Sequence, residues 1–394
     1  MNQVFIRSVE RNIDYWQRLI LRPLSHALAA LEKDWPNFYR ALSVGLTIPA
    51  TWSKTADLLT QTTPLIAERY FWQDYVVLLE AALARCPTDR PDQQGRLLDF
   101  LGIGYRQLGQ YQTAVQCHLT EEAIGQQQND ARRLAYARLN LSETYQQLQK
   151  YDIAKEKAQQ ALAYFQASDD HPHEIATLHF TIGNIHRNTG SYTQALDAYN
   201  KALDIQKRLG HTRDIVSLLH NIGVAYSSLG EHKVAIVKLE NAESLAISLN
   251  NIPLQAKILH QLGASYFSLG QPEQALEQFQ RVDIAGLKTV GAHEDIGWTY
   301  NNLGNVYLQK EAYAIAKDYF VQSNQAFAVL GLKVEQANAI GGLAEIAETL
   351  QQFAEANRLY QKALSLISDA NKSSWAQKKE QEFQKALDNL RKQL

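Results

Sequence analysis

Cysteine is scarce in this sequence, and its scarcity excludes two kinds of small-protein scaffold. The 394 residues contain only Cys86 and Cys117. No Cys-x-x-Cys pair occurs, so neither a zinc ribbon nor a disulfide framework is indicated. Both side chains are expected to be small packed residues, and free thiols fit a reducing compartment.

Excess charge and long apolar runs are also missing. With 39 basic and 41 acidic residues the net charge is −2, and Lys and Arg form no basic stripe. We therefore expect no nucleic-acid partner. No segment approaches the roughly 18 apolar residues of a membrane span, and residues 1–12 lack the apolar run of a signal peptide. These absences predict a cytoplasmic protein without membrane insertion.

Catalytic motifs are absent as well. There is no Gly-x-Ser-x-Gly, phosphate loop, dinucleotide fingerprint or His-Glu-x-x-His. Four histidines gather at positions 171, 173, 179 and 186, but His179 and His186 lie two helical turns apart. A packing or loop role is favoured over a metal site. We expect a protein that is not an enzyme, with no cofactor and no metal site.

What the sequence does contain is a small residue that recurs inside a helical pattern. Gly304 lies in Asn301-Asn302-Leu303-Gly304-Asn305-Val306-Tyr307, where alanine would favour a helix by about 1 kcal/mol. Such a glycine indicates close packing. The equivalent residues stand at 102, 142, 183, 223, 263, 304 and 344, in steps of 40 or 41 residues. This fixed period predicts a repeat array.

Each repeat is predicted to contain two helices. The first carries the small residue and ends seven positions later, at Gly109, Gln149, Gly190, Gly230, Gly270, Glu311 and Gln351. Glycine at that place suits a left-handed helix cap. The second helix has alanine at 114, 154, 195, 235, 275, 316 and 356. Four residues later come His118, Ala158, Tyr199, Leu239, Phe279, Phe320 and Tyr360.

These residues resemble the tetratricopeptide repeat. Its pattern has Leu-Gly-x-x-Tyr in the first helix, and in the second Ala, an aromatic residue four later and Ala three after that. Ala161, Ala202, Ala242 and Ala363 match the last position, whereas Glu121, Val282 and Ser323 depart from it. The long period is similar to that of spindle-orientation adaptors, kinesin light chains and bacterial sensor arrays. The resemblance implies an all-α fold, a right-handed superhelix (α-solenoid) of antiparallel helix pairs.

Three regions follow from this pattern. Residues 1–92 form an atypical helical N-terminal cap, with room for one or two degenerate repeats; residues 93–368 form seven repeats; and residues 369–394 form a C-terminal capping helix. The last helix would start at Ser373 or Ser374 and carry an apolar stripe of Phe383, Leu387, Leu390 and Leu394. Its alternative role is an amphipathic helix for a partner. Residues 283–294 are expected to be an interrepeat loop, either plain or hinge-like.

The resemblance also implies a ligand-binding surface, because the first helices line the concave groove in this family. The residues at the family's ligand-facing positions are Asn140, Asn184, Arg187, Asn188, His220, Asn221, Lys257, His260, Gln261, Trp298, Asn301, Asn302 and Asn305. A primary amide both donates and accepts, so it can pair with the backbone of an extended peptide. The alternative is that the asparagines bond between helices and stabilise the stack.

We therefore expect a scaffold or adaptor that binds a peptide or helix of a partner protein in its groove. The alternative is a regulatory sensor array that binds a small signal or peptide and controls a signalling or transcription partner. A co-purified ligand would favour the sensor. The sequence predicts neither the partner nor an oligomeric state.

Overall fold

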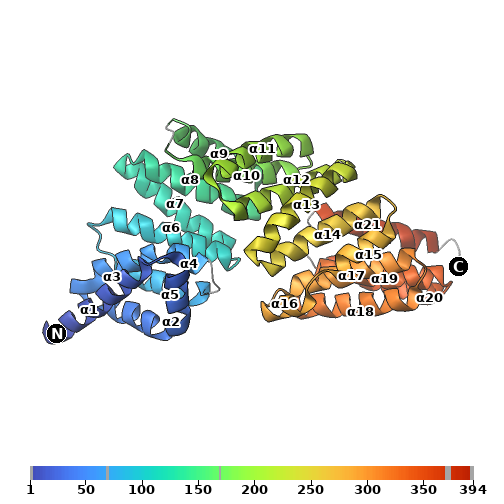
Figure 1. The fold of residues 1–394 in the computed structure, drawn as a ribbon, viewed down its shortest axis with the longest axis horizontal. Coiled ribbons are helices and arrows are strands. Elements are labelled where there is room, and N and C mark those ends of the chain that lie inside the picture. The colour runs from blue at the N-terminus through green and yellow to red at the C-terminus, as the bar shows by residue number, and fades with distance from the viewer. Residues whose placement is uncertain (1–2, 68–70, 168–169, 369–373, 391–394) are drawn as a thin grey trace. The chain divides into compact units, whose positions relative to one another are not determined.

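The computed structural model describes residues 3–67, 71–167, 170–368 and 374–390, and these ranges contain helices and no strand. The chain forms two compact units, Met1–Ile205 and Gln206–Leu394 (Figure 1). The predicted all-α fold is confirmed. Within the described ranges, no helix is both long and apolar enough to cross a bilayer.

The first unit begins with helices that precede the repeats and continues with the helix pairs of the first repeats. The helices are α1 (Gln3–Ile20), α2 (Leu24–Thr47), α3 (Pro49–Gln61), α4 (Thr63–Ala67), α5 (Trp72–Leu83), α6 (Pro91–Gln107), α7 (Tyr111–Gln128), α8 (Ala131–Gln147), α9 (Tyr151–Phe165), α10 (Pro172–Asn188) and α11 (Tyr192–Leu209), whose last turn contains the unit boundary.

The second unit holds the later repeats and one further helix. The helices are α12 (Thr212–Ser228), α13 (His232–Leu249), α14 (Ile252–Ser268), α15 (Pro272–Gln280), α16 (Ile284–Thr289), α17 (His293–Gln309), α18 (Tyr313–Leu330), α19 (Lys333–Thr349), α20 (Phe353–Ser368) and α21 (Ser374–Leu390).

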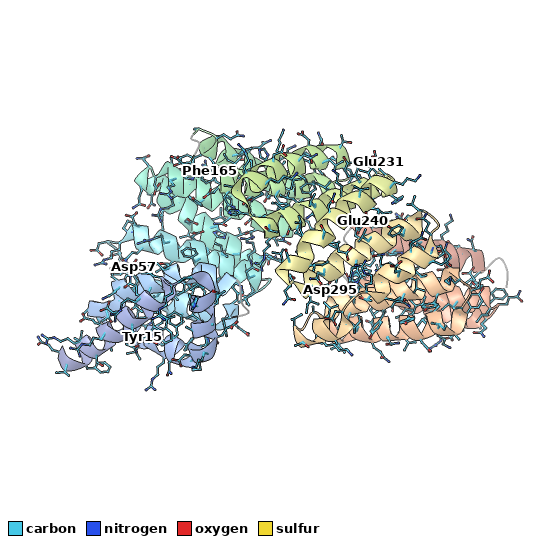
Figure 2. The ribbon with its side chains drawn as sticks, viewed as in Figure 1. Tyr15, Asp57, Phe165, Glu231, Glu240 and Asp295 are labelled. Atoms are coloured by element: carbon cyan, nitrogen blue, oxygen red, sulfur yellow. The ribbon has the colours of Figure 1, made fainter. Side chains whose placement is uncertain are left out.

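The two helices of each repeat pack through the recurring small residue. A Cβ added to Gly183 would lie 2.5 Å from the ring of Tyr199, and one added to Gly304 would lie 2.8 Å from the ring of Phe320. The glycine therefore makes room for the large residue of its own second helix. Phe165, at the end of α9, is fully buried between the rings of Tyr136 and His171 (Figure 2).

The predicted helix ends also form. The four glycines that close first helices have φ between +71° and +80°. Gln149, Glu311 and Gln351, which replace glycine in the other repeats, adopt the same region with φ of 58–59°. The left-handed cap is therefore set by the repeat and is imposed even on residues that disfavour it.

The N-terminal helices share one apolar core with the first repeat. Trp16 and Phe38 meet at 5.0 Å between ring centroids, and the same core continues through Trp52 to Leu97 and Leu101 of α6. The helix α2 is interrupted near Pro36: Asp34 has non-helical φ and ψ of −132° and 30°, and this kink separates two helical segments. Proline is a common cause of such a kink.

The expectation of a loop over residues 283–294 is wrong. The second helix of the fifth repeat breaks after Gln280, and residues Ile284–Thr289 form the short helix α16. Asp283 caps α16 by accepting a hydrogen bond from the backbone N–H of Gly286 at 2.9 Å. Leu287 is fully buried and anchors it, so the segment is packed structure rather than a free hinge.

The C-terminal helix α21 packs against α19 and α20. Phe383, Leu387 and Leu390 are buried in one cluster with residues of those helices. The ring of Phe383 occupies the space that a Cβ on Gly341 would need. Ser373, the side chain of Ser374 and Leu394 lie outside the described residues. We propose that α21 caps the array, because its apolar stripe is covered by the last repeat.

Candidate binding face

The first helices of neighbouring repeats are joined by side-chain hydrogen bonds about one repeat apart. Asn140 on α8 donates to Asp99 on α6 at 2.6 Å, and Asn338 on α19 donates to Asn301 on α17 at 3.2 Å. Ser227 and Ser265 share a hydrogen bond of 2.7 Å between α12 and α14. These bonds fix neighbouring first helices against each other.

His260 on α14 makes a further bond of this kind, to Thr299 on α17. The distance from His260 Nε2 to Thr299 Oγ1 is 2.8 Å, and the Thr299 hydroxyl donates to the carbonyl of Asp295 at 2.8 Å. Because that hydroxyl proton is already used, Nε2–H of His260 is the donor. Burial, with smaller effects of Lys257 and His220, lowers the pKa of His260 to about 4.

Four residues expected to face a ligand are held by the stack. Asn140 and Asn301 are 5% and 2% exposed, and both are bonded across repeats. His260 is bonded to Thr299. Trp298 is half-buried between Phe327 and Trp375, with ring centroids 5.3 and 5.8 Å away, so α21 covers part of it. Of these four, Asn140 and Asn301 make the bonds between helices that the alternative for the asparagines expected.

Other expected residues keep part of their surface in solvent. Asn184 is half-buried and accepts a hydrogen bond from Tyr199 at 2.7 Å. Arg187 is half-buried, and Asn188 is exposed and accepts from Arg187 at 3.3 Å. His220 is half-buried. Lys257 and Asn305 are exposed. These positions remain accessible to a ligand.

Three half-buried amides occupy one equivalent position in successive first helices. They are Asn221 on α12, Gln261 on α14 and Asn302 on α17, spaced by 40 and 41 residues. Asn221 donates to the carbonyl of Ser217 at 2.8 Å. The residue directly before the amide is His260 on α14 and Asn301 on α17, and both of these bond to the next repeat. In these two helices one residue joins neighbouring repeats, while the residue after it contributes the amide of the row.

One polar cluster in the first repeat was missed. Asp99, His118 and Glu121 bring their ligand atoms within 4.8 Å of one another. Its signal was present in the sequence, since His118 and Glu121 stand where other repeats have mostly apolar or small residues. The sequence alone does not bring Asp99 to these two residues, because Asp99 lies on the other helix of the repeat.

Helix pairs stacked at a constant period and joined between their first helices define an α-solenoid repeat protein. Four overlapping segments, residues 133–208, 173–248, 214–282 and 254–327, match the family model of the tetratricopeptide repeat. The chain therefore carries tetratricopeptide repeats, as its sequence pattern indicated. No curated protein sequence matches the chain.

Solved structures share this fold at low sequence identity. The apo quorum sensor NprR from B. thuringiensis is 16% identical, with 92% of this chain and 99% of that chain covered and a TM-score of 0.63. NprR in complex with its cognate peptide NprX is 17% identical, with 78% and 89% covered and a TM-score of 0.53.

Two further structures extend the likeness. A Rap protein complexed with Competence and Sporulation Factor is 14% identical, with 92% of this chain and 98% of that chain covered and a TM-score of 0.61. Aspartyl phosphate phosphatase F from Bacillus subtilis is 16% identical, with 91% and 94% covered and a TM-score of 0.58. At these identities the likeness concerns the fold, and it extends over nearly the whole chain.

Proposed function

We propose that this chain is a non-enzymatic binding protein whose first helices in repeats four to six hold an extended peptide segment of a partner. The observation that carries the proposal is the row of amides at Asn221, Gln261 and Asn302. Among the described residues, the side chains of Gln261 and Asn302 have no hydrogen bond to the stack. They are polar groups that the repeat packing does not require.

The chemistry of the row suits a peptide backbone. Each amide offers two N–H donors and one carbonyl acceptor, which are complementary to the C=O and N–H groups of an extended chain. Exposed Lys257 and Asn305 flank the row on α14 and α17. The lysine adds a positive charge that favours an acidic side chain or a terminal carboxylate on the ligand.

The solved structures support a peptide as the ligand class. NprR has been captured with its cognate peptide on a related fold, and a Rap protein with Competence and Sporulation Factor. The likeness to a quorum sensor also favours the second candidate function, a regulatory sensor whose peptide controls a downstream partner. A cytoplasmic location and the absence of a nucleic-acid partner remain predictions of this proposal.

The test is a peptide selection followed by matched variants. Random peptides displayed on phage are selected on the immobilised full chain, and the affinity of a selected peptide is measured by calorimetry. Gln261→Ala with Asn302→Ala should weaken binding about tenfold or more, since each lost hydrogen bond contributes about 0.5–1.5 kcal/mol. Asn241→Ala, an exposed amide on the second helix α13, is the control and should bind normally.

Unchanged affinity in the double variant, or no peptide recovered by selection, would count against the proposal. The sensor and adaptor versions differ in a second measurement. If the chain is a sensor, adding the selected peptide changes which partners cross-link to it in cells. If it is an adaptor, the peptide only competes with the partner that carries the same segment.

A further inference from the structure

The histidine and the glutamate of the cluster in the first repeat are not repeated at the equivalent positions of the other repeats. One other group of possible ligands among the described residues, His173, His211 and Asp214, lies near solvent at a different place in the repeats. At the position of His118, the other repeats have Ala158, Tyr199, Leu239, Phe279, Phe320 and Tyr360. At the position of Glu121 they have Ala161, Ala202, Ala242, Val282, Ser323 and Ala363. The repeat packing thus accommodates uncharged residues at both places. A buried histidine beside a buried carboxylate is a special feature of repeat one.

His118 and Glu121 are buried, and polar atoms of both are not satisfied by the protein. His118 is 0% exposed and Glu121 is 3% exposed. Neither ring nitrogen of His118 has a hydrogen-bond partner among the described residues, nor does Oε2 of Glu121. Leaving such groups unpaired costs about 1–3 kcal/mol each. The fold therefore retains a cost that Phe and Ala, present at these positions in other repeats, would remove.

Two of the unpaired atoms lie close together on α7. Nδ1 of His118 lies 3.6 Å from Oε2 of Glu121. A Cβ on Gly102 would lie 2.5 Å from Nε2 of His118, so that edge of the ring is turned toward Gly102 on α6. Asp99, one turn before Gly102, completes the group.

Neighbouring groups position the carboxylates and balance nearby charge. Asn140 donates to Oδ1 of Asp99 at 2.6 Å, which orients that carboxylate from the next repeat. Two arginines stand close by, but each has its own acidic partner. Arg106 pairs with Glu143 at 2.8 Å, and Arg133 pairs with Asp92 at 3.1 Å. Both arginines still act on the cluster through space: Arg106 and Arg133 favour the charged form of Asp99, and Arg133 favours that of Glu121.

We propose that Asp99, His118 and Glu121 bind a divalent transition-metal ion of the zinc type. One imidazole nitrogen and two carboxylate oxygens are a usual ligand set for Zn²⁺. Tetrahedral bonds of about 2.1 Å place donor atoms about 3.4 Å apart, close to the separation of His118 Nδ1 and Glu121 Oε2. Asn140 acts as the outer hydrogen-bond partner that metal-binding carboxylates commonly have. Three protein ligands leave a fourth position for water.

Burial affects the three groups in opposite directions. It lowers the pKa of His118, which favours the neutral imidazole, the form that coordinates a metal ion. It raises the pKa of the Asp99 and Glu121 carboxyls.

The competing explanation is a proton held between Glu121 and its neighbours, with no ion. The two explanations differ when Zn²⁺ or Co²⁺ is added to the full chain after dialysis against a chelator. Calorimetry should show one ion bound per chain, and Co²⁺ should give the visible absorption of a four-coordinate site. The ion should also raise the midpoint of thermal unfolding.

The variants use residues that other repeats already carry. His118→Phe copies repeats five and six, and Glu121→Ala copies repeats two, three, four and seven. Each should fold, lose the absorption band and bind the ion at least 100-fold more weakly. Asp99→Asn should weaken binding while keeping the shape of the side chain. His293→Ala, at an exposed histidine on α17, is the control and should bind like the parent chain.

Two results would overturn the proposal. One is no stoichiometric ion bound by the parent chain at micromolar concentration. The other is binding that survives in both His118→Phe and Glu121→Ala, since the ion would then sit elsewhere. Circular dichroism of each variant establishes that a loss of binding is not a loss of fold.

Discussion

At the scale of single residues, the contact between a glycine and a large side chain sets the distance between the helices of a repeat. Gly223 faces Leu239, and an added Cβ would lie 2.6 Å from that side chain. Gly304 faces Phe320 in the same way. In repeat two both partners differ together, since Ser142 stands opposite Ala158. The pair, rather than the glycine alone, is the unit of packing.

Gly304→Ala should therefore destabilise the chain although alanine is the better helix former. Overpacking costs about 1–3 kcal/mol, which exceeds the gain of about 1 kcal/mol in helix propensity. The measurement is chemical denaturation in a double-mutant cycle with Phe320→Ala. In that background Gly304→Ala should be neutral or stabilising. A loss of the same size in both backgrounds would show that the ring is not the cause.

The lowered pKa of His260 predicts that the free energy of unfolding depends on pH. Its pKa in the folded chain is about 4, below the ordinary value of 6.5, so protonation favours unfolding. The stability that depends on neutral His260 is complete above about pH 6.5 and is lost as the pH falls toward 4. It amounts to about 3 kcal/mol at most.

Denaturant unfolding between pH 7.5 and 4.5 measures this effect. His260→Gln keeps a donor for Thr299 without titrating, so its stability should fall less steeply with acid than that of the parent chain. His293→Ala serves as the exposed-histidine control and should keep the parent slope. Equal slopes for His260→Gln and the parent would refute the assignment.

The residue scale also shows which parts of the packing and of the candidate binding face the sequence could predict. The glycine positions were predictable because the same constraint recurs in seven repeats. Which asparagines bond to the next repeat was not predictable. Asn301 and Asn302 are adjacent, so their side chains lie about 100° apart around the helix. Asn301 bonds to Asn338 in the next repeat, whereas Asn302 is half-buried. The cluster at Asp99, His118 and Glu121 occurs once, so periodicity carried no information about it.

At the scale of helices, the array departs from the repeat pattern at α16, where a helix cap and a buried side chain stabilise an additional short helix. Asp283 caps α16 and Leu287 anchors it, so a segment with two glycines becomes helical. Glycine suggested a loop, but a capping carboxylate and one buried leucine are sufficient for two turns. At the C-terminal end, the three described members of the apolar stripe, Phe383, Leu387 and Leu390, are buried together, because their spacing follows the helical period.

Phe383→Ala tests whether α21 caps the last repeat. Phe383 is 7% exposed and packs over Gly341, so its truncation should cost about 3–5 kcal/mol locally. Hydrogen exchange should become faster in α21 and at the α19–α20 pair. Gln381→Ala, at an exposed position of the same helix, should leave exchange unchanged. Unaltered protection of α19 and α20 in Phe383→Ala would argue against the capping role.

At the scale of the whole molecule, a repeat in an array contacts mainly its neighbours in sequence. The loss of stability caused by one substitution should therefore remain near the substituted repeat. Trp52 is 4% exposed in the N-terminal core, and its indole N–H donates to the carbonyl of Ala82 at 3.2 Å. Trp52→Ala should speed hydrogen exchange in α1–α6 and leave α17–α20 protected. Phe327→Ala, at a fully buried ring of α18, should give the reverse pattern. Uniform loss of protection in either variant would show global cooperativity instead.

The left-handed caps give the array a further property. Gly230 and Gly270 have φ of 80° and 71°, and a second helix begins two residues after each, at His232 and Pro272. Removing residues 231–270 would join Gly230 to Gln271 through the same turn. Recombination between such copies can therefore shorten or lengthen the chain by whole repeats without a change of fold. The excised block contains Gln261, so each such event would also remove one amide from the row. Under the proposed function, the number of amides offered to a peptide would then change one repeat at a time.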